Sequence, residues 1–366
     1  MIFFDRQVKR FALISALATA SLLMMMLAGS CSKQGMAGGS SAYGGNGALS
    51  TTDEGCGEGD TLCISFCRLK SKAVSEGLEE NISSLDVIVL RDDSEDIVSY
   101  GHSAGVYVDA RVPKKVEVEY WIIANAPADI FSDLNTRSQF TSMVSLLTHN
   151  TASTLVMVGH GRQTFEKSES VEVEVTPAVS KLTLGGFTPS FYGTVYPGAA
   201  VSLRRAFLIN VCGSIPYTLV PTAGSEWLSK LSLDSSLSTD MKTFLVSEKD
   251  INITSKDRIE LPGTTFYFYP NPVSNDVTSA TEPLWSPRST RLVLELQIGS
   301  FTQYYALSLP AMQSGKAYSV DNLNLRGPGS ESPDILTDRT IMSFQVSVKP
   351  FDPSDIDCDL KIIAEQ

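Results

Sequence analysis

The sequence predicts an all-β protein made of β-sandwiches or barrels. Short runs with an apolar residue at every second position, or rich in β-branched residues, recur from residue 61 to residue 348, and such runs are typical of half-buried strands. Gly and Pro clusters separate these runs, as turns between strands require. The chain has 366 residues, and the part that follows residue 60 is long enough for two domains.

The expected strands and turns can be placed along the chain. The strands are Thr61–Cys67, Leu85–Leu90, Val116–Ile123, Val171–Val175, Lys181–Leu184, Ala206–Val211, Thr264–Tyr269, Arg291–Ile298, Phe301–Leu309, Ala317–Leu325 and Met342–Val348. The turns fall at Pro113, Gly185-Gly186, Pro270-Asn271-Pro272 and Arg326–Pro333. A helix is expected within Ser132–Leu147, with Ser132 as its N-cap. A domain boundary is expected just after Cys212, because a loop-rich stretch follows it through Asp257.

The N-terminus predicts export and lipidation. A short charged stub with a positive balance precedes the apolar run Phe11–Leu27, and the small residues Ala28, Gly29 and Ser30 lead into Cys31. This order is typical of a secretory signal peptide, and a cysteine directly after the small residues resembles a lipobox. The alternative is a transmembrane anchor with an incidental cysteine, but the run is short for a span of about 20 residues. We therefore expect a signal peptide over residues 1–30 and an outer-membrane lipoprotein lipidated (palmitate) at Cys31.

The segment after the lipidated cysteine predicts a tether, and the charge of the chain limits its partners. Residues 31–60 are rich in Gly, Ser and Thr with little apolar bulk, so they cannot bury enough surface to order themselves. The formal net charge is -12, which argues against nucleic acid or an anionic bilayer surface as a partner.

The cysteines, histidines and acidic residues do not predict catalysis. Cys63 and Cys67 are four residues apart in an expected strand, which separates them by about 13 Å, so we expect packing residues and neither a disulfide nor a zinc site between those two alone. The spacing of the histidines predicts no metal site, and His160 is expected in a turn; they are His102, His149 and His160. The acidic positions are expected in solvated loops, with calcium binding as the alternative; they are Asp92-Asp93, Asp250 and Asp257. No cofactor is expected, and an enzyme is the remotest class.

Several strand motifs, taken together in their order, carry a resemblance to a known family. They are Val118–Pro127 (VEYWIIANAP), Met157-Val158-Gly159, Ala206–Val211 (AFLINV), Phe266–Pro272 (FYFYPNP), Thr290–Leu296, Tyr305–Leu309 and, as the most specific, Lys316–Asp334 (KAYSVDNLNLRGPGSESPD). This series over most of residues 60–350 resembles the fimbrillins, the pilins of the type V pili (fimbriae) of Bacteroidales.

The resemblance implies both a fold and a function. It implies two transthyretin-like Greek-key β-sandwich domains with short helical insertions, at 61–212 and 213–366. It also implies export as a lipoprotein, cleavage by a trypsin-like and often arginine-specific surface protease, and release of the first strand. Other pilin subunits would then be its partners in donor-strand exchange at the cell surface. The resulting pilus would contribute to adhesion.

The first expected strand suits this mechanism. Leu62, Ile64 and Phe66 form one apolar face, and the loss of such a strand leaves an edge that seeks another strand. Basic residues follow directly, and the expected cleavage follows Arg68 or Lys72. The Lys72 site is nearer to the family's usual distance from the strand, although the family more often has arginine there. The alternative is an ordinary solvated loop.

The C-terminal tail offers a candidate donor strand. Residues 357–366 alternate through Cys358, Leu360 and Ile362, and they follow Pro350 and Pro353. Prolines detach a segment from a preceding strand, and an alternating extended tail can insert into a groove. The alternative is a last strand folded onto its own domain.

Other functions remain open from the sequence. An anchor subunit would stay lipidated and uncleaved, and a tip adhesin would expose a binding surface. A glycan-binding surface lipoprotein unrelated to pili would need aromatic platforms, for which the scattered tryptophans are Trp121, Trp227 and Trp285.

Overall fold

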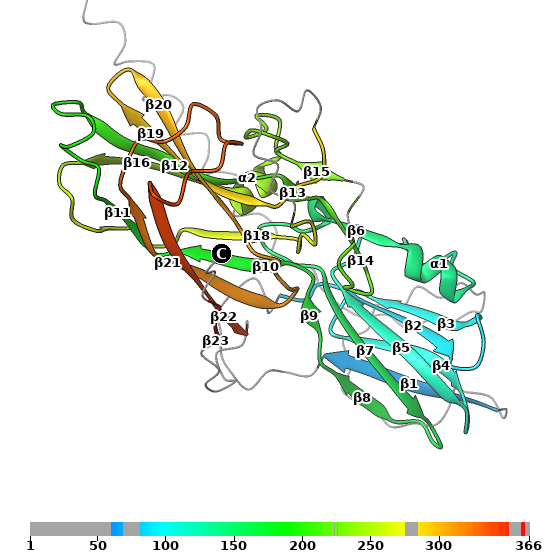
Figure 1. The fold of residues 1–366 in the computed structure, drawn as a ribbon. Coiled ribbons are helices and arrows are strands. Elements are labelled where there is room, and N and C mark those ends of the chain that lie inside the picture. The colour runs from blue at the N-terminus through cyan, green and yellow to red at the C-terminus, as the bar shows by residue number, and fades with distance from the viewer. Residues whose placement is uncertain are drawn as a thin grey trace, which may run out of the picture. The chain divides into compact units, whose positions relative to one another are not determined.

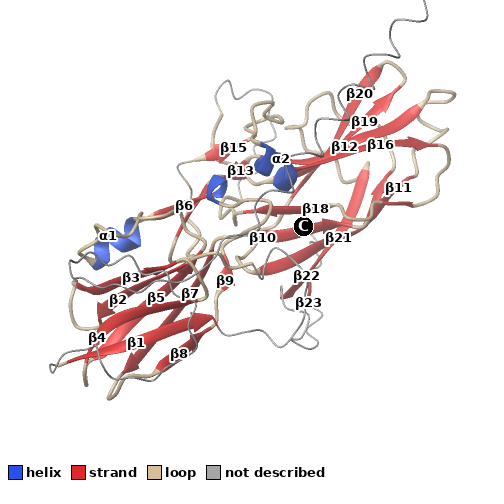
Figure 2. Cartoon of the chain, turned by 180° about the vertical axis from the view of Figure 1, so that it is seen from behind, coloured by secondary structure: helices blue, strands red, loops and turns tan. Residues whose placement is uncertain are grey.

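Strands form two β-sandwiches in the computed structural model, which describes residues 60–68, 81–222, 224, 226–274, 285–350 and 360–362. Helices in this part of the chain are short: α1 (Arg137–Ser142), the 3-10 turn η2 (Leu147–His149) and α2 (Thr239–Leu245) (Figures 1 and 2). The predicted all-β sandwich class with short helical insertions is therefore confirmed.

The first sandwich pairs a three-stranded sheet with a five-stranded sheet. Their orders are β4-β1-β8 and β3-β2-β5-β7-β9. The strands are β1 (Thr61–Arg68), β2 (Leu85–Arg91), β3 (Ile97–Ser103), β4 (Tyr107–Pro113), β5 (Glu117–Ala124), β7 (Met157–Thr164), β8 (Ser170–Val173) and β9 (Thr176–Pro177).

Alternating patterns place the inner faces of this sandwich. In β4 the inward residues Val108, Ala110 and Val112 are buried, while the residues between them are exposed, as a strand with one wet face requires. Nearly all of β2 is buried, which fits a strand covered on both faces.

The second sandwich contains a seven-stranded and a four-stranded sheet. The larger sheet has the order β17-β11-β21-β10-β18, with β22 on β21 and β23 on β22, and the smaller has the order β16-β12-β19-β20. The strands are β10 (Ser180–Leu184), β11 (Gly186–Pro189), β12 (Val201–Ile209), β16 (Val246–Ile253), β17 (Ile259–Glu260), β18 (Thr265–Phe268), β19 (Arg291–Ile298), β20 (Phe301–Ser308), β21 (Lys316–Leu325), β22 (Met342–Pro350) and β23 (Leu360–Ile362). Short ladders add β6 (Val144–Leu146) on β14 (Ser214–Pro216) and β13 (Val211–Cys212) on β15 (Trp227–Leu228).

The two sandwiches share one topology. The first strand β1 lies between antiparallel β4 and parallel β8. In the second sandwich, two strands that are consecutive along the chain take the place of β1. β10 lies between antiparallel β18 and parallel β21, and β11 lies between antiparallel β17 and the same parallel β21. The facing sheets also correspond: the strand order β3-β2-β5-β7 of the first sandwich matches the order β16-β12-β19-β20 of the second. The same arrangement is therefore built twice, although no sequence repeat signals it.

The predicted domain boundary after Cys212 is displaced from the change of sheets. Strands up to Pro177 pair within the first sandwich, whereas Ser180 onward pairs with the second. β12, which the sequence placed at the end of the first domain, pairs with β16 and β19. The reason is that alternation marks a strand but does not identify its partners.

The predicted helix start and the predicted turn at His160 are wrong. Thr136 caps α1, in a capping box with Gln139, whereas the Ser132 hydroxyl donates to the Asp129 carbonyl 2.8 Å away. His160 lies within β7, opposite Trp121.

The glycines beside His160 are explained by crowding and do not mark a turn. A Cβ at Gly159 would lie 2.5 Å from the Glu174 carbonyl oxygen, and one at Gly161 would lie 2.4 Å from the Tyr120 hydroxyl. Glycine in a strand often marks such close approaches.

Candidate functional site

The backbone of β1 is paired along both edges. Its residues from Thr61 to Cys67 face Pro113 to Tyr107 of β4 in antiparallel register. On the other edge, residues 65–68 run parallel to residues 170–173 of β8. The amide of Lys114 also donates to the Asp60 carbonyl at 2.7 Å. Because both edges are paired, β1 is a central strand of its sheet (Figure 1).

The inward face of β1 is buried in an aromatic core. Ile64 and Phe66 are both 0% exposed, and Leu62 is half-buried. The Phe66 ring lies 4.9 Å from Tyr120 and 6.4 Å from Phe165, between ring centroids. Burial of a side chain of this kind contributes about 1.5–3 kcal/mol. The three residues predicted as one apolar face therefore pack inward as a unit.

The neighbours of β1 are apolar toward it. Val108, Ala110 and Val112 of β4 are buried, as are Val171 and Val173 of β8. Without β1, these side chains and the facing backbone groups of β4 and β8 would border an open groove with two unpaired edges. We call this space the β1 groove.

The predicted cleavage positions lie at and beyond the end of β1. Arg68 is the last residue of β1 and is paired with Val173. Beside this end, Tyr107 and Val106 are 52% and 46% exposed. Lys72 lies outside the described residues, as do the signal peptide, Cys31 and the tether up to residue 59.

Cys67 of β1 is a packing residue, as predicted, whereas Cys63 is half-buried. Cys67 is buried and its Sγ donates to the Val171 carbonyl at 3.6 Å. Burial raises the pKa of the Cys67 thiol, which keeps it protonated and unreactive.

The C-terminal candidate strand is paired within its own chain. Residues Leu360 to Ile362 form β23, antiparallel to Val348 to Val346 of β22. Cys358 lies outside the described residues. This pairing is the arrangement that the self-folded alternative predicts for the tail.

A buried carboxylate on β5 holds α1 against the first sandwich. Glu119 is 4% exposed, forms an ion pair with Arg137 of α1, and accepts from His160 Nε2 at 2.8 Å. Burial alone would raise the pKa of Glu119, but the hydrogen bonds from Arg137 and His160 outweigh it and lower that pKa. The His160 ring also lies against Trp121, tilted by 39°, with 4.4 Å between the ring centroids. No pattern in the sequence signals Glu119, since its partners are distant in sequence.

The most specific motif of the resemblance has a structural role in this chain. Asp334, at its end, pairs with Arg288 at 2.7 Å and Arg291 at 2.8 Å, and accepts from Asn210 at 2.9 Å. The Tyr305 hydroxyl donates to the Gly327 carbonyl at 2.9 Å. The motif therefore fixes the segment that follows β21.

The tryptophans do not form one exposed platform. Trp227 and Trp285 meet edge-on at 5.2 Å, but Trp227 is only 7% exposed. Trp121 packs against Phe140 of α1 instead.

The acidic positions lie as follows. Asp92 pairs with Arg162, and Asp257 accepts from Ser255 in a turn. Asp250 lies in β16 and pairs with Arg204, so it is on a strand and not in the predicted loop.

Across the described ranges, His, Cys, Asp and Glu form no group of three or more suited to a metal ion. No helix in those ranges is long and apolar enough to cross a membrane.

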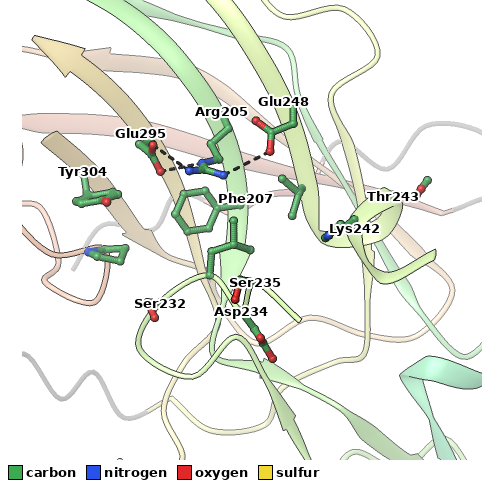
Figure 3. A pocket seen from close by; sticks show the side chains of 13 residues that line it. Arg205, Phe207, Ser232, Asp234, Ser235, Lys242, Thr243, Glu248, Glu295 and Tyr304 are labelled. Carbon is green, nitrogen blue, oxygen red and sulfur yellow. Dashed lines mark hydrogen bonds and ion pairs between the residues drawn. The ribbon is translucent and has the colours of Figure 1, made fainter. Parts of the chain in front are cut away.

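A hollow of about 690 Å³ lies on the second sandwich (Figure 3). Its lining comes from β12, β16, β19, β20, α2 and two loops: Arg205, Phe207, Ser232, Leu233, Asp234, Ser235, Lys242, Thr243, Val246, Glu248, Glu295, Tyr304 and Pro333. No motif in the sequence predicts this hollow, because its residues lie far apart along the chain.

Two sandwiches of one topology, each with its first strand held between an antiparallel and a parallel neighbour, define the class of fold. Solved structures of fimbrial and adhesion proteins share it. A candidate cell adhesion protein from Bacteroides eggerthii is 14% identical and matches 80% of this chain and 97% of its own, with a TM-score of 0.57. A second one, from Parabacteroides distasonis, is 14% identical and matches 82% and 99%, with a TM-score of 0.56.

A named pilin also shares the fold. The fimbrilin of Porphyromonas gingivalis is 12% identical, matches 80% of this chain and 98% of its own, and has a TM-score of 0.54. No protein-family model and no curated protein matches the chain. The chain thus has the fold of a fimbrilin, as the sequence resemblance predicts.

Proposed function

We propose that this chain is a structural subunit of a cell-surface type V pilus that contributes to adhesion. It is exported as a lipoprotein through Cys31 and loses β1 by proteolysis after Arg68 or Lys72. It then polymerises when a strand of another subunit fills the β1 groove.

One observation carries the proposal: β1 is central, apolar on its inner face, and followed directly by basic residues. Ile64 and Phe66 are fully buried, and both edges of the strand are paired. A single cut after such a strand turns a closed sandwich into an acceptor for another strand. The likeness to the fimbrilin fold supports the same proposal.

The alternating tail supplies the donor in this proposal. Leu360 and Ile362 lie on a three-residue strand whose backbone pairs only with β22 among the described residues. So short a ladder leaves little to break before the tail extends into a neighbour's groove.

An uncleaved anchor subunit is the second candidate, and the position of Arg68 favours it. Its backbone is paired with Val173 in the sheet, so a protease that needs an extended, unpaired substrate cannot engage the Arg68 bond unless that end of β1 opens. This candidate stays lipidated at Cys31 and keeps β1.

The test is the N-terminus of the protein on the cell surface, determined by mass spectrometry of outer-membrane and sheared fractions. A start just after Arg68 or Lys72 in the sheared fraction is expected. A chain that begins at lipidated Cys31 and is found only in the membrane fraction would rule out the polymerising subunit and favour the anchor.

A further inference from the structure

The hollow in Figure 3 lies on the face of β16-β12-β19-β20 that points away from the sandwich core. Along β12, Leu208 belongs to the main core, whereas Phe207 and Ile209 form a separate small cluster with Val293 and Ala306. Since side chains alternate along a strand, this second cluster is on the outer face. The hollow is therefore independent of β1 and its groove.

The hollow has an apolar floor and a charged rim. Phe207, Val246 and Tyr304 lie along the floor, and Leu233 covers one side. At the rim in Figure 3, the Arg205 guanidinium contacts Glu295 at 2.8 Å and Glu248 at 3.4 Å.

One buried side chain holds both covering segments in place. The Asn210 Oδ1 accepts from the Leu231 amide at 3.0 Å, and the Asn210 Nδ2 donates to Asp334 at 2.9 Å. Ser232 and Pro333, which line the hollow, are the direct neighbours of Leu231 and Asp334. The walls are thus fixed before any ligand arrives, which lowers the entropic cost of binding.

The rim offers donors and acceptors that the protein itself does not use. Within the described ranges, the Lys242 ammonium, the Tyr304 hydroxyl and the Ser232 hydroxyl have no hydrogen bond or ion pair. Asp234 accepts only locally, from Ser236 at 2.7 Å and 2.8 Å. Arg205, in contrast, is already matched by carboxylates.

We propose that this hollow is a binding site for a neutral saccharide. Sugar hydroxyls donate and accept, so one ligand can serve the Lys242 ammonium and the Asp234 carboxylate together, while its apolar ring face lies over Tyr304. An anion would meet Glu248 and Glu295, and a purely apolar ligand would strip water from charged groups at a cost. The volume of about 690 Å³ lies within the roughly 300–1,000 Å³ of small-molecule sites.

Saturation-transfer NMR on the purified full chain tests this site. The probes are D-glucose, D-galactose and N-acetylglucosamine, with N-acetylneuraminic acid as the anionic comparison. Transfer to the ring protons of at least one neutral probe is expected. Tyr304→Phe, which keeps the ring, should weaken binding about 2- to 10-fold, and Leu233→Arg, which fills the hollow, should abolish it.

Arg204→Ala is the matched control. Arg204 is the exposed neighbour of Arg205 on β12, pairs with Asp250 at 2.9 Å and does not line the hollow, so its loss should leave binding unchanged. The proposal is overturned if no neutral probe receives transfer, if only the acidic probe does, or if Leu233→Arg and Tyr304→Phe bind like the unchanged chain. The outcome is separate from pilus assembly, because the assay needs neither cleavage nor polymerisation.

Discussion

At Phe66, one side chain couples β1 to the core of the first sandwich. Its ring is fully buried and contacts Tyr120 and Phe165 from other elements. Truncation of a buried phenylalanine removes the favourable free energy of transferring its ring from water to the core, and it also removes the packing contacts of the ring. The stability of the uncleaved sandwich therefore depends strongly on this residue.

Phe66→Ala should lower the free energy of unfolding of the full chain by about 3–5 kcal/mol. Chemical denaturation measures it, with Tyr107→Ala as the control, because Tyr107 is 52% exposed on the adjacent strand. The control should change stability by no more than about 0.5 kcal/mol. Equal effects of the two variants would contradict the packing argument.

Glu119 gives a pH dependence whose sign follows from its lowered pKa. A carboxyl with a folded-state pKa below its ordinary value of 4.5 stabilises the fold above that value, and this stabilisation is lost as pH falls through the folded-state pKa. Glu119→Gln should therefore lower the melting temperature at pH 7 and make less difference at pH 3. Glu117→Gln, an exposed position on the same strand, should have little effect at either pH. A penalty for Glu119→Gln that is the same at both pH values would contradict the ion-pair assignment.

At the scale of elements, alternation located many strands, but several others were left out, including β4, whose apolar and polar residues alternate regularly. β1, β2, β5, β10 and β18 to β22 lie where the sequence places them. β7 was missed because Gly159 and Gly161 interrupt its pattern, and β16 because it is an edge strand with mixed exposure. The boundary expected after Cys212 and the change of sheets near Pro177 differ in position, since strand pairing is a long-range property. The hollow could not be predicted, because its residues meet only after folding.

Gly159→Ala tests the close approach that explains the interrupted pattern. The new Cβ would lie 2.5 Å from the Glu174 backbone oxygen, so β7 or the segment after β8 must shift, at a cost of about 1–3 kcal/mol. Gly105→Ala is the control, because its nearest neighbour is a serine hydroxyl 3.6 Å away. Thermal unfolding should show a lower melting temperature for Gly159→Ala alone; an unchanged value would show that the strand has room.

At the scale of the whole molecule, one topology is used twice with different edges. In the second sandwich, β22 pairs along the outer side of β21. In the first sandwich, the strand that corresponds to β21 is β8, and within the three-stranded sheet β8 pairs with β1 alone. The proposed exchange of strands therefore acts on the smaller sheet, where the loss of one strand separates both remaining ones.

Limited trypsin digestion should convert the full chain into self-associating subunits. Size-exclusion chromatography should show larger species after cleavage, and an excess of a peptide with the β1 sequence TLCISFCR should suppress them by refilling the groove. The same peptide with Phe66→Ala should not. A chain with Arg68→Gln, Lys70→Gln and Lys72→Gln should stay monomeric; larger species from that chain would contradict cleavage beside β1 as the trigger.

The pairing of β1 with β8 also determines the order in which the first sandwich can close during synthesis. Among the described strands β1 is synthesised first, yet the Cys67 thiol donates a hydrogen bond to the Val171 carbonyl, which lies 104 residues further along the chain. Contacts of such high sequence separation form slowly, because a long loop must close first. Within the first sandwich, the strand that the proposed cleavage removes is thus also the one whose pairing takes longest to complete, and until β1 docks the groove of a nascent chain is open to any extended segment.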